Sequence, residues 1–278
     1  MKQPENKEGL IEYERFVYPD GQPNIKLKTE IDRKEGVNIA CRVRNPNELF
    51  DLLMVADIVN RQSYVDKLTI LYLMGGRTDR VLSFDQPFTL RIVADMINTI
   101  KARKVEIIEP HSKRTVDLIN NSIATSGTVL CSKIKDREFL IATPDKGATE
   151  RYKSDIVCSK VRDAVTGKLS GFKVDDVRCS PNGETIVLMD DLIDGGGTFV
   201  GIHEKLKDMN PSEIYLVVTH AIQEKGLRRV SKAFDKVLIT NTFKDWQDDD
   251  EWVEGKPENL IVSEYEKEDI CHGCKIQT

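Results

Sequence analysis

The chain has 278 residues, of which 40% are hydrophobic and 31% are charged, and its formal net charge is -5 at pH 7. A chain of this length and composition can form two ordinary domains with separate cores, and it is neither disordered nor fibrous. The negative charge argues against a nucleic-acid partner. Because no apolar run reaches the roughly eighteen residues of a membrane span and the N-terminus MKQPENKEGL lacks a signal-peptide core, we expect a cytoplasmic protein without a membrane partner.

Apolar runs of strand length alternate with amphipathic runs of helix length along most of the chain. The pattern predicts strands at 67–74, 104–110, 137–145, 185–191, 213–220 and 234–242. It predicts helices at 88–102, 112–122, 148–157 and 198–209. Strands separated by helices are typical of parallel βαβ units, and the pattern restarts near residue 123. We therefore predict an α/β fold of two similar domains, 1–123 and 124–278, each a mainly parallel sheet flanked by helices.

Four of the predicted strands end in motifs that carry polar or glycine residues. These motifs are GGRTDR (75–80), EPHS (109–112), TPDKG (143–147) and DDLIDGGGT (190–198). Ligands of open parallel sheets bind beyond the carboxyl ends of the strands, so these positions are the candidates for chemistry.

The motif at 190–198 combines two carboxylates with three consecutive glycines. Glycines allow the backbone to approach a ligand, and the helix that follows offers unpaired N–H groups to an anion. Carboxylates beside an anion site hold a divalent cation or accept hydrogen bonds from sugar hydroxyls, so a phosphorylated sugar fits both halves of the motif. The alternative is an acidic strand-to-helix turn in which Asp194 caps the helix. The motif is not a Walker A loop, because no Gly-Lys-Ser/Thr follows.

The stretch VLMDDLIDGGGT (187–198) resembles the phosphoribosyl-diphosphate loop of type I phosphoribosyltransferases and of ribose-phosphate diphosphokinases. Other segments favour the diphosphokinases. RTDR is similar to that family's Arg-Gln-Asp-Arg, PHS to its metal-histidine turn, TPDKG to its Ser-Pro-Asp turn and SKVRD (159–163) to its Lys-x-Arg catalytic loop. The resemblance runs in collinear order from about Tyr18 to Phe243, and it implies two phosphoribosyltransferase-like domains.

The resemblance implies an activity and its co-substrates. Enzymes of this family use Mg²⁺ and transfer the diphosphoryl group of ATP to the anomeric hydroxyl of ribose 5-phosphate, which yields phosphoribosyl diphosphate and AMP. Cationic side chains and metal ions must offset the charge that develops on the phosphate oxygens. The implied partners are therefore ATP and a ribose 5-phosphoryl compound.

The resemblance also assigns roles to individual residues. The implied catalytic residues are Lys160, Arg162 and His111, and the implied metal ligands are His111 and Asp145. The ATP side comprises Arg77, Asp79 and Arg80, together with Tyr18, Asp20 and Gln22 of a segment that in the family reaches the adenine of a neighbouring subunit. The ribose-phosphate side comprises Asp190, Asp191, Asp194, Gly195, Gly196, Gly197 and Thr198. A homo-oligomer, dimer or hexamer, with a shared adenine site follows.

Each assignment has a plainer alternative. His111 after Pro110 could cap a helix, Lys160 and Arg162 could be solvated surface charges, and Asp20 could belong to an ordinary Pro-Asp-Gly turn.

The chain departs from the family pattern at several site positions. Gly195 stands where threonine is usual, Thr78 where glutamine is usual, and Gly75 with Gly76 where larger residues are common. These changes enlarge the site, so the same reaction on ADP-ribose is an alternative to ribose 5-phosphate. A catalytically silent regulatory homologue and a phosphoribosyltransferase are further alternatives, which the retained catalytic residues and the N-terminal motifs respectively disfavour.

The chain contains six cysteines, a number that fits a reducing compartment. Cys41, Cys131, Cys158 and Cys179 are interpreted as reduced core residues. Cys271 and Cys274, in CHGC, have metal-ligand or redox spacing, but no second close pair is present to complete a zinc site, so an incidental pair is favoured.

Overall fold

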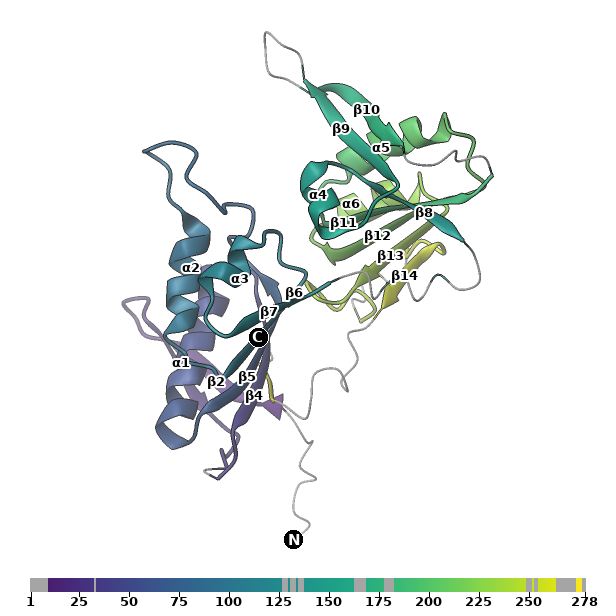
Figure 1. Ribbon diagram of the computed structural model, residues 1–278. Helices are drawn as coiled ribbons and strands as arrows, with labels where there is room; N and C mark the ends of the chain where they lie inside the picture. Colours follow the sequence, from purple (N-terminus) through teal and green to yellow (C-terminus); the bar gives the residue numbers. More distant parts are fainter. Residues whose placement is uncertain are drawn as a thin grey trace. The chain divides into compact units, whose positions relative to one another are not determined.

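The computed structural model describes residues 10–32, 34–126, 130, 134, 138–162, 169–177, 183–248, 252, 255–263 and 274–276. The chain forms two compact units, which we call unit 1 (residues 1–125 and 265–278) and unit 2 (residues 126–264) (Figure 1). The sequence placed residues 124–278 in one domain. The structure instead assigns residues 265–278 to unit 1, because β15 (Cys274–Ile276) pairs with strands of that unit.

Unit 1 contains a six-stranded sheet in the order β1-β15-β4-β5-β6-β7, and every neighbouring pair is parallel. Besides β15, its strands are β1 (Leu10–Ile11), β4 (Val37–Val43), β5 (Val65–Leu73), β6 (Lys104–Ile108) and β7 (Ser122–Thr125). Its helices are α1 (Pro46–Gln62), α2 (Thr89–Asn98) and α3 (Arg114–Leu118). A separate antiparallel hairpin joins β2 (Tyr13–Val17) to β3 (Pro23–Leu27).

Unit 2 contains a seven-stranded sheet in the order β10-β9-β8-β11-β12-β13-β14. The strands are β8 (Phe139–Thr143), β9 (Ile156–Arg162), β10 (Leu169–Val177), β11 (Thr185–Ile193), β12 (Ile214–Ala221), β13 (Lys236–Thr240) and β14 (Leu260–Ser263). The helices are α4 (Lys146–Arg151), α5 (Gly197–Lys207) and α6 (Glu224–Ser231). All pairs are parallel except β9 with β10. Two mainly parallel sheets flanked by helices confirm the predicted α/β class.

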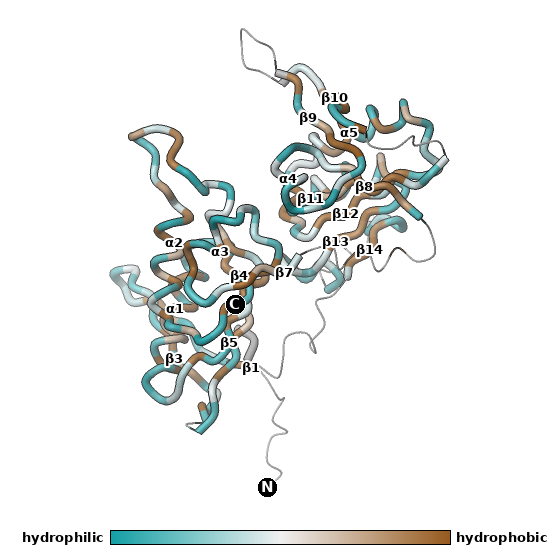
Figure 2. Tube along the Cα trace, viewed as in Figure 1, coloured by the Kyte–Doolittle hydropathy of each residue, from teal (hydrophilic) through white to brown (hydrophobic). Residues whose placement is uncertain are grey.

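The central strands are buried on both faces because helices cover them. Every residue of β12 is buried, and Figure 2 shows hydrophobic residues along the strands of unit 2. Trp246 and Trp252, from the segment between β13 and β14, add a pair of indoles with ring centroids 5.4 Å apart to this core. No helix in the described part of the chain is long and apolar enough to cross a membrane.

All four predicted helices end earlier than the sequence indicated, and after two of them the chain enters a strand within the predicted range. The helix predicted at 148–157 is α4, which stops at Arg151; Tyr152 is extended at φ -117° and ψ 135°, and β9 begins at Ile156. The helix predicted at 112–122 is α3, which stops at Leu118, and Ser122 begins β7 beside β6. In both cases the residues that follow join the sheet, so tertiary pairing overrides local helix propensity.

The two described buried cysteines have the predicted character. Cys41 and Cys158 are free and buried, and burial raises the pKa of each thiol to about 12. Cys131, Cys179 and Cys271 and the side chain of Cys274 lie outside the described residues.

Candidate functional site

The paired aspartates of β11 form a buried acidic centre with one arginine. Asp190 and Asp191 are followed by two more strand residues, so β11 continues to Ile193. Arg151, the last residue of α4, places Nη2 2.8 Å from Asp190 Oδ1 and 2.7 Å from Asp191 Oδ1. The Asp191 side chain is 2% exposed and that of Asp190 is 18% exposed. One guanidinium thus bridges both carboxylates.

Burial and the neighbouring charge make this centre electrostatically costly. Desolvation raises the pKa of Asp190 well above its ordinary value, and the adjacent Asp191 raises it further. Arg151 opposes both effects.

The glycine turn after β11 needs glycine for steric reasons at one of its positions. Gly196 has φ 73° and is the N-cap residue of α5, so the N-cap position offers no side chain to the helix N–H groups. A Cβ at Gly196 would lie 2.9 Å from the Gly226 carbonyl oxygen and 3.0 Å from Val230 Cγ1. A Cβ at Gly195 would meet no atom within 4 Å. The turn therefore packs tightly at Gly196 and is open at Gly195.

Neighbouring side chains hold this turn. Arg229 Nη1 donates to the Gly195 carbonyl oxygen at 2.8 Å, and Gln223 Nε2 donates to Asp194 Oδ1 at 2.7 Å. The N-cap position belongs to Gly196 rather than to Asp194, contrary to the plainer alternative. With Gly197 and Thr198 in the first turn of α5, the predicted anion cradle has uncapped N–H groups at its centre.

Asp145 and Lys160 flank the same edge of the unit 2 sheet. Asp145 follows β8, is exposed, and caps α4 by accepting the Ala148 N–H at 2.9 Å. Strand β9 pairs with β8 through Val157 opposite Thr143, the last residue of β8. Lys160 therefore lies three residues past the end of β8, or about 10 Å at strand rise.

The Lys-x-Arg segment is a strand, not the extended loop that the sequence predicted. Lys160 is in register with Phe172 of β10, and Arg162 with Leu169. Lys160 is exposed, while the side chain of Arg162 lies outside the described residues. Because alternate strand residues share a face, the two positions lie on the same face of the β9–β10 hairpin.

Unit 1 brings together the turns that follow β5 and β6. Arg80 makes a bidentate contact with Asp79, with Nε–Oδ1 at 2.7 Å and Nη2–Oδ2 at 3.0 Å. These hydrogen bonds lower the pKa of Asp79 to about 2, and a hydrogen bond from Ser112 contributes. Arg114 Nη1 donates to the Asp79 carbonyl oxygen at 3.0 Å. Asp79 therefore links the two turns.

His111 lies beside the first of these turns. A Cβ at Gly76 would lie 3.2 Å from His111 Cβ, so the glycine allows the imidazole to sit close to the backbone. Arg77 and His111 are both exposed, on the loops that follow β5 and β6.

The predicted adenine-side segment lies on a different sheet. Tyr18, Asp20 and Gln22 occupy the tip of the β2–β3 hairpin, and all three are exposed. The Gly21 N–H donates to the Tyr18 carbonyl and the Gln22 N–H to Asp20 Oδ1, at 2.8 and 3.0 Å. This is a tight Pro-Asp-Gly turn that the Asp20 side chain helps to close.

Three side chains of the site were not predicted from the sequence: Arg151, Gln223 and Arg229. Arg151 could have been sought, because two adjacent buried carboxylates require a cationic partner. Gln223 and Arg229 follow β12, and their contacts with the glycine turn depend on strand order.

The predicted metal ligands, His111 and Asp145, are few, as expected for magnesium that takes most of its ligands from water and substrate. The described residues contain no group of three or more His, Cys, Asp or Glu side chains placed to hold a metal. Mg²⁺ commonly uses one or two protein ligands and completes its octahedron with water and phosphate oxygens.

The fold consists of two α/β units, each built on a mainly parallel sheet flanked by helices. A Pyrococcus abyssi protein named ribose-phosphate pyrophosphokinase is 28% identical over 252 residues, which cover 84% of this chain and 85% of that protein. A protein of the same name from Mycoplasmopsis pulmonis is 28% identical over 258 residues, covering 87% and 80%. These relatives confirm the predicted resemblance to the ribose-phosphate diphosphokinases, which are also called pyrophosphokinases.

A solved structure supports the same fold. The crystal structure of phosphoribosylpyrophosphate synthetase from Mycobacterium smegmatis matches with a TM-score of 0.72 and 18% identity, over 91% of this chain and 86% of that one. No protein-family model matches the chain.

Proposed function

We propose that the protein transfers the diphosphoryl group of ATP to the anomeric hydroxyl of ribose 5-phosphate, giving phosphoribosyl diphosphate and AMP. The observation that carries this proposal is the junction of β11 and α5. There a buried diacid suited to ribose hydroxyls stands next to an uncapped helix N-terminus suited to a phosphate. The names of the homologous proteins support the same activity.

The chain's own residues supply positioning and charge. Asp190 and Asp191 orient the ribose, and the 195–198 turn binds its 5-phosphate. Lys160 and Arg162, on the hairpin that extends beyond β8, offset the charge on the transferring phosphates. Arg77 and Arg80 bind the phosphates of ATP, and Asp79 fixes their turn through Arg80 and Arg114.

The magnesium ion belongs to the same proposal. The proposed magnesium ligands are His111 in unit 1 and Asp145 in unit 2, and bound magnesium would neutralise phosphate charge. Asp145 can serve as both helix cap and ligand, because Ala148 occupies one carboxylate oxygen.

The identity of the nucleotide product tests the proposal. The full chain is incubated with Mg-ATP and ribose 5-phosphate, and nucleotides are separated by chromatography. AMP is expected, because the diphosphoryl group moves in one piece. ADP as the sole nucleotide product would contradict the proposal, and absence of turnover would favour the silent regulatory alternative.

We also propose that the active form is a homo-oligomer in which the Tyr18–Gln22 turn completes the adenine site of a neighbouring subunit. Its exposed Tyr18 side chain, 44% accessible, supports this reading. Mixing a Tyr18→Ala variant with a Lys160→Ala variant, each of low activity alone, should raise the activity above that of either variant, since one mixed site then carries neither substitution. Failure to restore activity under subunit exchange would place both residues in one subunit's site.

A further inference from the structure

The hairpin formed by β9 and β10 packs against helix α5 through one aromatic side chain. Phe172 of β10 is partly buried against the core of unit 2, and Figure 1 shows β10 beside α5. A Cβ at Gly201, inside α5, would lie 2.1 Å from Phe172 Cε2 and 2.3 Å from Phe172 Cδ2. The Phe172 ring therefore occupies the space in which any side chain at residue 201 would begin.

The glycine at position 201 has a packing reason. Glycine in a helix interior destabilises the helix relative to alanine. At Gly201 the missing side chain lets the aromatic ring of Phe172 lie directly on the helix backbone, which offsets that cost. In contrast, a Cβ at Gly171, which precedes Phe172 in β10, would meet no atom of the described chain within 4 Å. The close approach is thus specific to Phe172 and Gly201.

This contact lies opposite Lys160 on the hairpin. Phe172 is in register with Lys160, and directly opposite residues of an antiparallel pair have their side chains on the same face. The next pair on that face is Val174 with Cys158, and both side chains join the core that α5 also joins. Lys160 therefore lies on the face of the hairpin that is turned toward α5.

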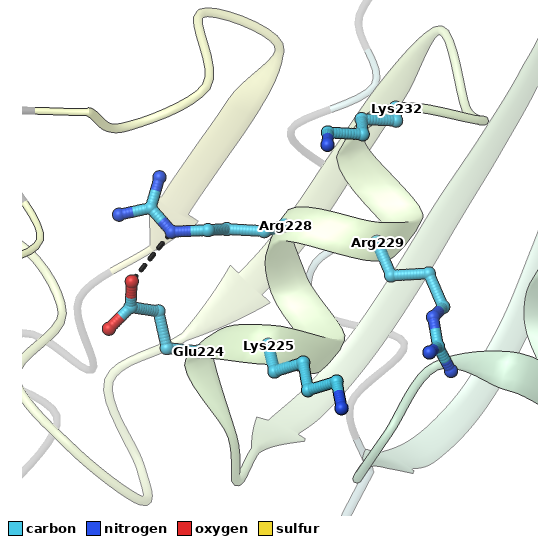
Figure 3. Close-up of a pocket in the computed structure, with 5 residues that line it drawn as sticks. All are labelled: Glu224, Lys225, Arg228, Arg229 and Lys232. Carbon is cyan, nitrogen blue, oxygen red and sulfur yellow. Dashed lines mark hydrogen bonds and ion pairs between the residues drawn. The ribbon is translucent and has the colours of Figure 1, made fainter.

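The same helix carries the phosphate-binding turn. Gly201 lies four residues after Gly197, which is about one helical turn, or ~6 Å along the axis of α5. Helix α6 also holds the turn, because Arg229 Nη1 donates to the Gly195 carbonyl oxygen at 2.8 Å. Figure 3 shows that the Arg229 side chain extends from α6 on the side away from Arg228. The turn is therefore fixed to two helices of unit 2.

We propose that Phe172 and Gly201 are positioning residues, whose contact anchors the β9–β10 hairpin to α5 and so fixes Lys160 relative to the 195–198 turn. This inference rests on the proposed function, in which the turn holds the 5-phosphate and Lys160 offsets charge on the transferring diphosphoryl group. Transfer requires both groups in place at once, and a small displacement of either lowers the rate strongly. Among the described residues, the part of β9 that carries Lys160 pairs with β10 alone, so its position depends on how β10 packs.

Transfer kinetics of the full chain test the anchoring contact. Gly201→Ala adds a methyl group where the ring lies, and Phe172→Val removes most of the ring while keeping a residue that favours strands. Each variant should lower kcat for AMP release about tenfold, because the hairpin is displaced. Each should keep the calorimetric affinity for ribose 5-phosphate within about twofold of wild type, because the turn is not displaced. Gly171→Ala is the matched control, since it adds a methyl group next to Phe172 without a close contact, and it should retain the wild-type kcat.

A double variant and a measurement without substrate separate positioning from a general loss of packing. In Phe172→Val combined with Gly201→Ala, the alanine methyl group takes space that the smaller valine leaves, so kcat should be higher than in Gly201→Ala alone. Hydrogen exchange needs no activity. In Gly201→Ala, amides of β9 and β10 should exchange faster than in wild type, while those of β11 and β12 should be unchanged.

Several results would overturn the inference. Wild-type kcat in both single variants, or no rescue in the double variant, would show that the contact does not position Lys160. Ribose 5-phosphate affinity that falls as much as kcat would show that the contact supports the turn instead. Unchanged exchange of the hairpin amides would show that the contact does not hold the hairpin. If wild type releases no AMP while hairpin exchange still rises in Gly201→Ala, the proposed function fails and the anchoring contact stands.

Discussion

At the scale of single residues, the acidic centre on β11 places two carboxylates where burial makes charge costly. The chain buries Asp191 beside Asp190 and supplies one guanidinium for both carboxylates. Removing a single partner from a buried ion pair leaves an uncompensated charge, which typically costs about 3–5 kcal/mol. A site built only for stability would not place two like charges in sequence there. The arrangement is explained if hydroxyls of a ligand need both acceptors.

We predict that Asp190→Asn stabilises the fold near neutral pH and abolishes transfer. The pKa of Asp190 is raised in the folded protein. Stability is therefore lost as pH rises from the ordinary carboxyl pKa through the raised value, and the full cost is present above it. The asparagine removes that cost, and we expect a gain of about 1 kcal/mol, a usual size for relieving active-site strain.

Denaturant unfolding at several pH values measures this effect. The gain should be largest near neutral pH and disappear as pH approaches 4, because wild-type Asp190 is then also protonated. Asp208→Asn is the control, since that side chain is 74% exposed. A variant less stable than wild type at neutral pH would show that the Asp190 charge is net favourable.

At the scale of elements, the glycines in and beside the turn differ in whether packing requires them. A Cβ at Gly226 would lie 1.8 Å from the Asp194 carbonyl oxygen, whereas one at Gly195 would touch nothing within 4 Å. We predict that Gly226→Ala lowers the free energy of unfolding by at least about 2 kcal/mol through overpacking. Gly195→Ala should stay within about 0.5 kcal/mol of wild type. Thermal unfolding of both variants checks this, and equal stabilities would mean that α6 moves away from the turn at little cost.

The β9–β10 hairpin carries the next prediction. Lys160 is an exposed residue of β9, on the part of that strand that extends past the end of β8 and pairs with β10. Truncating its side chain therefore removes charge without removing core contacts. Lys160→Ala and Arg162→Ala should each lower kcat by about a hundredfold, as expected for charge stabilisation realised in the transition state. Lys236→Ala is the control and should retain activity, because Lys236 is the first residue of β13 and so lies at the amino end of the strands. Near wild-type kcat in both hairpin variants would show that this segment does not take part in catalysis.

The sequence predicted elements whose hydrophobic pattern can be read from one continuous segment of the chain. The strand predicted at 185–191 contains an unbroken apolar run at 186–189, and it forms β11. In contrast, residues 156–162 were divided between a predicted helix and a loop, because β9 is defined by pairing with β8 and β10. The site residues that the sequence predicted are likewise those close together in the chain. Asp190 and the glycines lie within one short motif, 190–198, whereas Arg151 and Arg229 reach them from 34 or more residues away.

At the scale of the whole molecule, the division into units departs from the order of the chain. Residues 274–276 return to unit 1 and lie between β1 and β4, so unit 1 is built from both ends of the chain. No hydrophobic periodicity reveals such a return, because three residues are too few for a pattern. Unit 2 is continuous from 126 to 264 and contains the diacid, the glycine turn and α6.

We therefore predict that residues 126–264 expressed alone fold and bind ribose 5-phosphate but release no AMP from ATP. Binding is expected because Asp190, Asp191 and the turn at 195–198 belong to this unit, together with their supporting Arg151 and Arg229. Transfer should fail because Arg77, Arg80 and His111 belong to unit 1. Calorimetry with ribose 5-phosphate and chromatography of nucleotides measure the two properties, and Asp190→Asn in the same fragment controls for non-specific binding. AMP release by the isolated unit would show that the ATP site lies within unit 2, and a folded fragment without affinity would show that ribose phosphate binding needs both units.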